Sequence, residues 1–161
     1  MKEQLRPGEI KEEGGTVYIA RIRLSLLRED TAEEPIIINS QHDAANLDFI
    51  KEEFTESDRE RFICLHLNVK HAVISFEVVS VGSLNFAPVH PREVFKGAIL
   101  SNSAAIIVMH NHPSGDPEPS AEDIAVTKRL VDAGKLIGIE VLDHIIFGDK
   151  GFVSLKERGV M

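Results

Sequence analysis

The sequence contains a single cysteine among its 161 residues, so no disulfide can form within the chain. This scarcity is typical of proteins that function in a reducing compartment, and we expect a cytoplasmic location. Cys64 lies in the apolar run FICLHL, where a thiol packs as a small hydrophobic side chain. We therefore expect Cys64 to be buried rather than reactive.

Long hydrophobic runs are also lacking, and none approaches the roughly 18 apolar residues that a membrane span needs. The N-terminal residues, MKEQLRPGEIKEEGG, are charged and contain no apolar core. This pattern excludes a signal peptide or a membrane anchor at the start of the sequence, and we expect no membrane partner.

Positive charge is in deficit, because 18 Lys and Arg residues face 26 Asp and Glu residues, which gives a formal charge of −8. Proteins that bind the phosphate backbone normally carry a basic surface. The composition therefore counts against DNA binding as the main activity. A hydrophobic content of 43% and a charged content of 27% are ordinary for a globular protein, and the length suits one core.

Apolar periodicity predicts a single α/β domain with a mixed sheet flanked by helices. Residues 1–15 are predicted to be a flexible tail, residues 16–58 an N-terminal extension of strands and one helix packed on the core, and residues 59–161 the main domain. Strands are expected at 16–27, 34–40, 62–67, 71–82, 103–110 and 136–149, and a short strand with a helical turn is expected within 151–159. Helices are expected at 42–54, 90–102 and 120–133, with Pro91 near the first helical position of the second.

The segment HNHPSGDPEPSAED, residues 110–123, concentrates the residues that suit a metal site. Side chains two residues apart in an extended chain point the same way, so His110 and His112 can present two imidazoles to one point while Asn111 faces away. Two histidines and one carboxylate leave a fourth zinc position open, as in catalytic sites. The turn-rich segment that follows lets the next helix begin beside the histidines, which makes Asp123 a candidate third ligand.

The same residues fit a purely structural interpretation. Ser120 and Asp123 have the spacing of a capping box at a helix start, although Glu is the better-attested partner at the third helical position. Asp116, Glu118 and Glu122 are closer to the histidines in sequence, and spacing alone does not exclude them as ligands.

The motifs resemble a known family. His-x-His followed after seven residues, which begin with Pro113, by Ser-x-x-Asp resembles the JAMM metalloprotease signature, and the runs VHPREVFKGAI, HNHPSGDPEPSAEDI and IEVLDHIIFG are similar to the RadC family, the bacterial branch of the JAB/MPN proteins. The resemblance covers residues 59–161 and implies a JAB/MPN-like, cytidine-deaminase-like fold. RadC proteins often carry an N-terminal helix-hairpin-helix region, and residues 1–50 show no glycine-hairpin signature for it.

The resemblance implies a role for each matching residue. His110, His112 and Asp123 would ligate one Zn²⁺ ion per chain, and Ser120 would donate a hydrogen bond to the developing oxyanion. The glutamate that moves the proton lies before the first core strand in the family, which corresponds to Glu60 here.

Other residues compete for roles near this centre. Glu93 and Glu77 are the rivals of Glu60, although Glu93 also suits the first turn of a helix and Glu77 a solvent-facing strand position. His144 is expected to be a hydrogen-bonded core residue with Asp143 as its partner, or else a residue that orients a ligand.

Three functions follow as hypotheses. The first is a zinc-dependent hydrolase that cleaves peptide or isopeptide bonds in a protein or peptide substrate of unknown identity. The second is a DNA-associated accessory protein of repair or recombination, as the family name suggests. The third is a non-catalytic JAB scaffold. The oligomeric state does not follow from the sequence.

Overall fold

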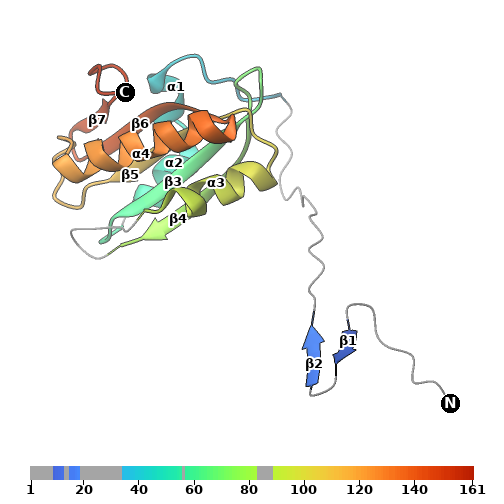
Figure 1. Cartoon of the computed structure of the whole chain (residues 1–161). Coiled ribbons are helices and arrows are strands. Elements are labelled where there is room, and N and C mark those ends of the chain that lie inside the picture. The colour runs from blue at the N-terminus through green and yellow to red at the C-terminus, as the bar shows by residue number, and fades with distance from the viewer. Residues whose placement is uncertain (1–8, 13–14, 19–33, 56, 83–88) are drawn as a thin grey trace.

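The computed structural model describes residues 34–55, 57–82 and 89–161, together with two short strands nearer the N-terminus (Figure 1). Those two strands, β1 (Glu9–Glu12) and β2 (Gly15–Tyr18), pair with each other antiparallel. The remaining elements are α1 (Gln41–Ala45), α2 (Asp48–Phe54), β3 (Arg61–Leu67), β4 (Val73–Val81), α3 (Pro91–Leu100), β5 (Ala105–Asn111), α4 (Ala121–Ile137), β6 (Glu140–Gly148) and β7 (Gly151–Ser154).

The main sheet has five strands in the order β4-β3-β5-β6-β7. The β5–β6 pair is parallel, and every other neighbouring pair is antiparallel. Strand β5 lies at the centre and all seven of its residues are buried. This confirms the mixed sheet and the prediction of a strand covered on both faces, which the continuous apolar run of β5 indicates.

Helices cover both faces of this sheet, so the molecule has three layers (Figure 1). On one face, α3 and α4 pack through Val94, Phe95 and Leu130 against β3 and β5 side chains such as Phe62 and Val108. On the other face, α1 and α2 pack through Ala44 and Ile50 against Ile63, Leu65, Ile107 and Met109. Alternation along each strand sends successive side chains to opposite layers, and Cys64 is fully buried beneath the α3 and α4 layer, as expected.

The predicted helix at 42–54 is wrong as a single element. The chain forms two short helices instead, because α1 ends at Asn46 and Leu47 has an extended conformation. The side-chain amide of Asn46 donates to the carbonyl of His42 at 2.9 Å. Asparagine side chains that bond the local backbone in this way compete with helix continuation.

Two predicted strands also differ from the structure. Helix α4 runs to Ile137 and stops at Gly138, whose φ of 83° is left-handed, so β6 begins at Glu140 rather than at 136. The apolar pair Leu136–Ile137 suggested a strand, whereas the glycine after it is the usual helix stop. The predicted strand at 34–40 is reduced to one bridge between Ile37 and Ala72. Most of the predicted tail, and the predicted strand beyond Tyr18, lie outside the described residues.

Candidate metal centre

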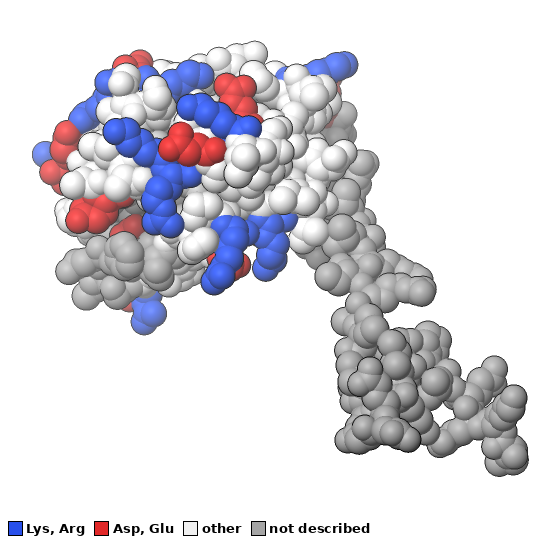
Figure 2. All heavy atoms as spheres, in the orientation of Figure 1, with Lys and Arg blue, Asp and Glu red and all other residues white. Residues whose placement is uncertain are grey.

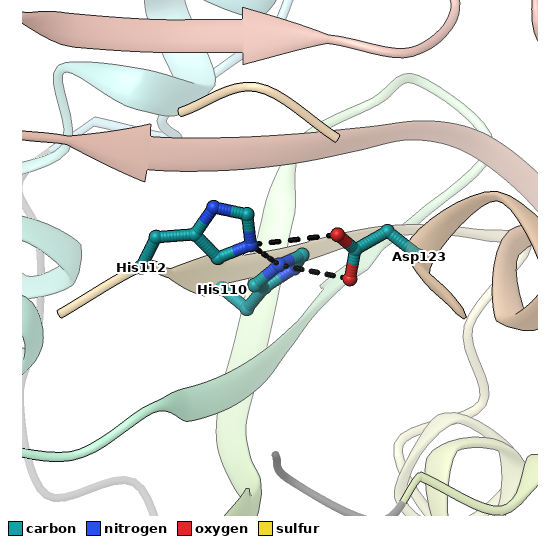
Figure 3. Close-up of side chains that lie close together, drawn as sticks. All are labelled: His110, His112 and Asp123. Atoms are coloured by element: carbon teal, nitrogen blue, oxygen red, sulfur yellow. Dashed lines mark hydrogen bonds and ion pairs between the residues drawn. The ribbon is translucent and has the colours of Figure 1, made fainter. Parts of the chain in front are cut away.

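The end of β5 and the start of α4 bring three side chains together (Figure 3). The Nε2 atoms of His110 and His112 lie 3.0 Å apart. The two carboxylate oxygens of Asp123 lie 3.2 Å from His110 Nε2 and 3.4 Å from His112 Nε2. The predicted ligands therefore meet at one point, whereas Asp116, Glu118 and Glu122 are not members of this group.

The spacing of these atoms fits a tetrahedral metal ion. Two ligand atoms that are each about 2.0–2.1 Å from zinc, at tetrahedral angles, lie roughly 3.3 Å from one another. The 3.0 Å between the two imidazole nitrogens is close to this separation, and Asp123 presents a different oxygen to each imidazole, at 3.2 and 3.4 Å. Two imidazole nitrogens and a carboxylate facing each other are mainly hydrogen-bond acceptors, so a cation or a proton must lie between them. The group could therefore hold a metal ion.

A tight loop sets the orientation of His112. The amide of His112 donates to the carbonyl of Phe147 at 2.8 Å, and its ring Nδ1 lies 2.7 Å from the carbonyl of Asp116. Gly115 turns the loop with a φ of 81°, which favours glycine. A side chain at Gly148 would collide with the backbone of Gly115 and with Pro117, so β6 supports this loop by close approach.

Asp123 reaches the histidines because a capping box fixes the first turn of α4. The Ser120 hydroxyl accepts from the amide of Asp123 at 3.1 Å, and the Asp123 carboxylate accepts from the amide of Ser120 at 2.7 Å. The Ser120 hydroxyl also donates to Asp123 Oδ2 at 2.6 Å. The capping-box interpretation of the Ser-x-x-Asp pattern is therefore confirmed, and the capping carboxylate is also the one that faces the imidazoles.

The Asp123 carboxylate and the facing imidazoles shift each other's pKa values. Burial raises the pKa of Asp123, but hydrogen bonds from His110, His112 and Ser120 outweigh it, and the net pKa lies well below its ordinary value. The hydrogen bond from Asp123 raises the pKa of His112 despite partial burial. Without a metal ion, the carboxylate therefore favours the protonated form of the His112 imidazole.

Glu60 lies at the residue before β3, and its negative charge contributes to the raised pKa of His112. Asn111 explains this placement. Its side chain accepts from the amide of Arg61 at 2.8 Å and donates to the carbonyl of Arg59 at 3.1 Å. These two hydrogen bonds hold the backbone on both sides of Glu60. Asn111 does face away from the histidines, as predicted. Its positioning contact with the Glu60 segment does not follow from the sequence pattern, because it joins residues 50 positions apart.

The two rival glutamates lie elsewhere. Glu93 is exposed in the first turn of α3 and pairs with Arg92 at 3.1 Å and with Lys96 at 4.0 Å. Glu77 lies on β4 opposite Cys64 and faces Gly97 of α3, where burial raises its pKa. Of the three candidates, Glu60 is the one whose charge acts on His112, and its role in proton transfer stays a prediction.

His144 is fully buried behind the group formed by His110, His112 and Asp123. Its Nε2 lies 2.8 Å from His110 Nδ1, and its Nδ1 lies 2.6 Å from the Thr127 hydroxyl. Asp143 is not the partner of this ring, since its carboxylate accepts from the amide of His144 and the hydroxyl of Ser154. The expected Asp143 pairing was therefore wrong for the imidazole, because neighbouring residues of a strand point to opposite faces.

This arrangement agrees with the comparison to known proteins. Residues 38–160 match the family model described as the RadC-like JAB domain. The chain belongs to the RadC-like JAB domain family. A UPF0758 protein of Desulfitobacterium hafniense is 51% identical over 152 residues, which cover 91% of this chain and 66% of that protein. The UPF0758 protein YsxA of Bacillus subtilis is 54% identical over 129 residues, covering 80% and 55%. The chain thus spans about half to two thirds of the length of these RadC-family relatives.

A cavity adjoins this RadC-type centre. It has a volume of about 420 Å³ and includes His112, Pro113 and Asn111 in its wall, with Phe54 of α2 and Phe147 of β6 on its apolar side. Its wall is about equally polar and apolar. An open hollow of mixed character therefore lies beside His112.

The expectations about DNA and membranes can be compared with the surface. Figure 2 shows Lys and Arg side chains interspersed with Asp and Glu on one face, without a continuous basic surface there. No helix among the described residues is long and apolar enough to cross a membrane. The DNA-associated hypothesis for this RadC-like domain therefore stays a prediction without support from this face.

Proposed function

We propose that this chain is a zinc-dependent hydrolase of the JAMM type that cleaves peptide or isopeptide amide bonds with a water nucleophile. The observation that supports this proposal best is the group of two imidazole nitrogens and one carboxylate with separations of 3.0–3.4 Å. His110, His112 and Asp123 would hold the ion. Zinc supplies Lewis acidity, which activates water and polarises a carbonyl near neutral pH.

Glu60 would act as the proton carrier. Its carboxylate would take the proton of the attacking water and later deliver it to the leaving nitrogen of the amide. The charge of Glu60 already acts on His112, which supports a place at the edge of the centre. The hydrogen bonds of Asn111 to the neighbouring backbone would hold this carboxylate in position.

Ser120 would stabilise the negative charge that develops on the carbonyl oxygen. Its hydroxyl now donates to Asp123 Oδ2. Rotation of the hydroxyl about the Cβ–Oγ bond would release that proton for the oxyanion, while the backbone amide of Ser120 would still hold the carboxylate. An extended substrate would reach the centre with one side chain in the cavity beside His112.

The first experiment measures metal content by elemental mass spectrometry in the untagged protein after zinc is supplied. We expect about one zinc per chain in the wild type and a loss of zinc in Asp123→Ala. Asp132→Ala is the matched control, since it removes an exposed carboxylate of the same helix. A wild-type protein that holds no zinc would overturn the proposal.

The second experiment measures hydrolysis. A library of fluorogenic peptides and lysine isopeptides is screened with the zinc-loaded wild type. We expect Glu60→Gln to keep the zinc and lose at least about a hundredfold in kcat, because general acid–base catalysis contributes about 10²–10⁴-fold. Equal activity of Glu60→Gln and wild type would remove Glu60 from the mechanism and return Glu93 and Glu77 to consideration.

A further inference from the structure

A chain of three hydrogen bonds leads from the backbone of α4 to the first histidine of the metal centre. The Thr127 hydroxyl donates to the carbonyl of Asp123 at 2.5 Å and lies 2.6 Å from His144 Nδ1. His144 Nε2 lies 2.8 Å from His110 Nδ1. All three side chains are nearly or fully buried, so water does not compete for these contacts.

The direction of the chain follows from the Thr127 hydroxyl. A hydroxyl has one proton, and Thr127 gives it to the carbonyl of Asp123, which can only accept. Toward His144, the Thr127 oxygen can therefore only accept. The proton between these two residues must belong to His144 Nδ1.

The second ring nitrogen of His144 must then be bare. His144 is completely buried, and its two nitrogens contact a hydroxyl and an imidazole rather than a carboxylate. A second proton would place an uncompensated cation in the core, which is strongly unfavourable. His144 Nε2 is thus an acceptor, and the proton in its contact with His110 belongs to His110 Nδ1.

We propose that Thr127 and His144 are positioning residues that hold a proton on His110 Nδ1, so that Nε2, which faces Asp123 and His112, is the ring nitrogen available to the ion. This inference rests on the proposed metal centre. His112 reaches the same state by a shorter route, because its Nδ1 faces the carbonyl of Asp116 directly. A backbone carbonyl thus fixes the proton of His112 directly and that of His110 through the hydrogen-bond chain. Both rings leave Nε2 for the ion.

Removing the Thr127 hydroxyl should change the proton positions along the whole series of hydrogen bonds. In Thr127→Val, a substitution of similar shape, His144 Nδ1 loses its acceptor. The tautomer of His144 with its proton on Nε2 then becomes the more stable one. That proton then faces His110 Nδ1, so His110 must carry its own proton on Nε2, where the ion would bind. Because the competent tautomer becomes a minor population, the apparent zinc affinity falls in proportion.

The direct test is the protonation of the rings. Long-range ¹H–¹⁵N correlation spectra of the uniformly ¹⁵N-labelled full chain at pH 8 distinguish protonated from bare imidazole nitrogens. We expect His144 with its proton on Nδ1 and His110 with a proton on Nδ1, both in the metal-free and in the zinc-loaded protein. A proton on His144 Nε2 would overturn the inference.

The second readout is zinc affinity, measured by competition with a chromophoric chelator. We expect Thr127→Val to weaken zinc binding by about 10–100-fold and Thr127→Ser, which keeps the hydroxyl, to restore it. The visible absorption of the Co²⁺-loaded protein should change in Thr127→Val and not in Thr127→Ser. Equal zinc affinity of both variants and wild type would overturn the inference.

The two proposals fail separately. If the wild type binds no zinc, the proposed function fails, and the tautomer assignment is judged by the spectra of the metal-free protein alone. If zinc binds but His144 carries its proton on Nε2, the metal centre stands and the positioning role is rejected. Dispersed amide spectra of each variant establish that it is folded.

Discussion

Asp123 combines two tasks in one side chain. Its Oδ2 accepts from the amide and hydroxyl of Ser120, and its Oδ1 lies 3.2 Å from His110 Nε2. The capping contacts restrict the carboxylate before any ion binds, which lowers the entropy lost on metal binding. A single residue therefore joins the local stability of α4 to the geometry of the candidate metal centre.

His66 gives a residue-scale prediction that is independent of the metal. It is buried beside Ser75 and Ser101, and burial lowers its pKa to about 4. In the unfolded chain its pKa is about 6.5, so only the unfolded state takes up this proton between those values. The contribution of His66 to stability is therefore complete above about pH 6.5 and is lost as pH falls toward 4.

The expected result is a loss of about 3 kcal/mol from this residue across that range. Urea unfolding of the metal-free protein at several pH values measures it. His66→Gln should be less stable at neutral pH and show a shallower decline below pH 6.5. His42→Gln, which changes an exposed histidine, should keep the wild-type slope. Parallel pH profiles for wild type and His66→Gln would contradict the prediction.

At the scale of elements, the start of α4 is decisive. Ser120 is the N-cap, and Asp123 closes the capping box from the third helical position. Helix α4 then runs 17 residues along the sheet to Gly138, so its first turn is held at the centre by its own packing as well as by the cap. Capping and oxyanion stabilisation by Ser120 can be separated by two substitutions.

Ser120→Ala should lower the unfolding free energy of the metal-free protein by about 1 kcal/mol, because an N-cap acceptor is lost. Ser120→Gly should recover most of this, since glycine at an N-cap costs only a few tenths of a kcal/mol. Both variants lack a side-chain donor, so both should lose hydrolytic rate if Ser120 stabilises the oxyanion. Unfolding curves and kcat together measure this split. Full kcat in Ser120→Gly would reduce Ser120 to a cap.

At the scale of the whole molecule, the candidate centre joins parts of the fold that are distant in sequence. His110 belongs to the central strand, Asp123 to a helix on one face, and Glu60 to the segment before β3. An ion held by His110, His112 and Asp123 would connect the sheet to the α4 layer in the native state only. Binding that excludes the unfolded state raises stability through mass action.

Zinc should therefore raise the thermal midpoint of the protein. At a free zinc concentration about 100 times the Kd, the gain is about 2.7 kcal/mol, which corresponds to a Tm increase of about 5–10 °C for a chain of this length. Differential scanning calorimetry with zinc and then with a chelator measures it. Asp123→Ala should show no increase, whereas Asp132→Ala should respond as wild type. A Tm that does not change on adding zinc would contradict the prediction.

Local patterns were sufficient to predict much of this protein from sequence. The unbroken apolar run of β5 indicated a central strand, and the two histidines at its end are brought to one side by the two-residue period of a strand. Ser120 and Asp123 showed the start of α4 through their capping spacing. These inferences succeed because each depends on residues only a few positions apart.

Tertiary structure alone decided the surroundings of the centre. The hydrogen bond between His110 and His144 joins residues 34 positions apart, and the hydrogen bond from the Arg61 amide to Asn111, beside Glu60, joins residues 50 positions apart. Strand order and register create these contacts, and neither is encoded in a local period. The sequence by itself therefore determined the three candidate ligands, whereas folding decided which buried groups orient them, because orientation depends on neighbours that only the assembled sheet provides.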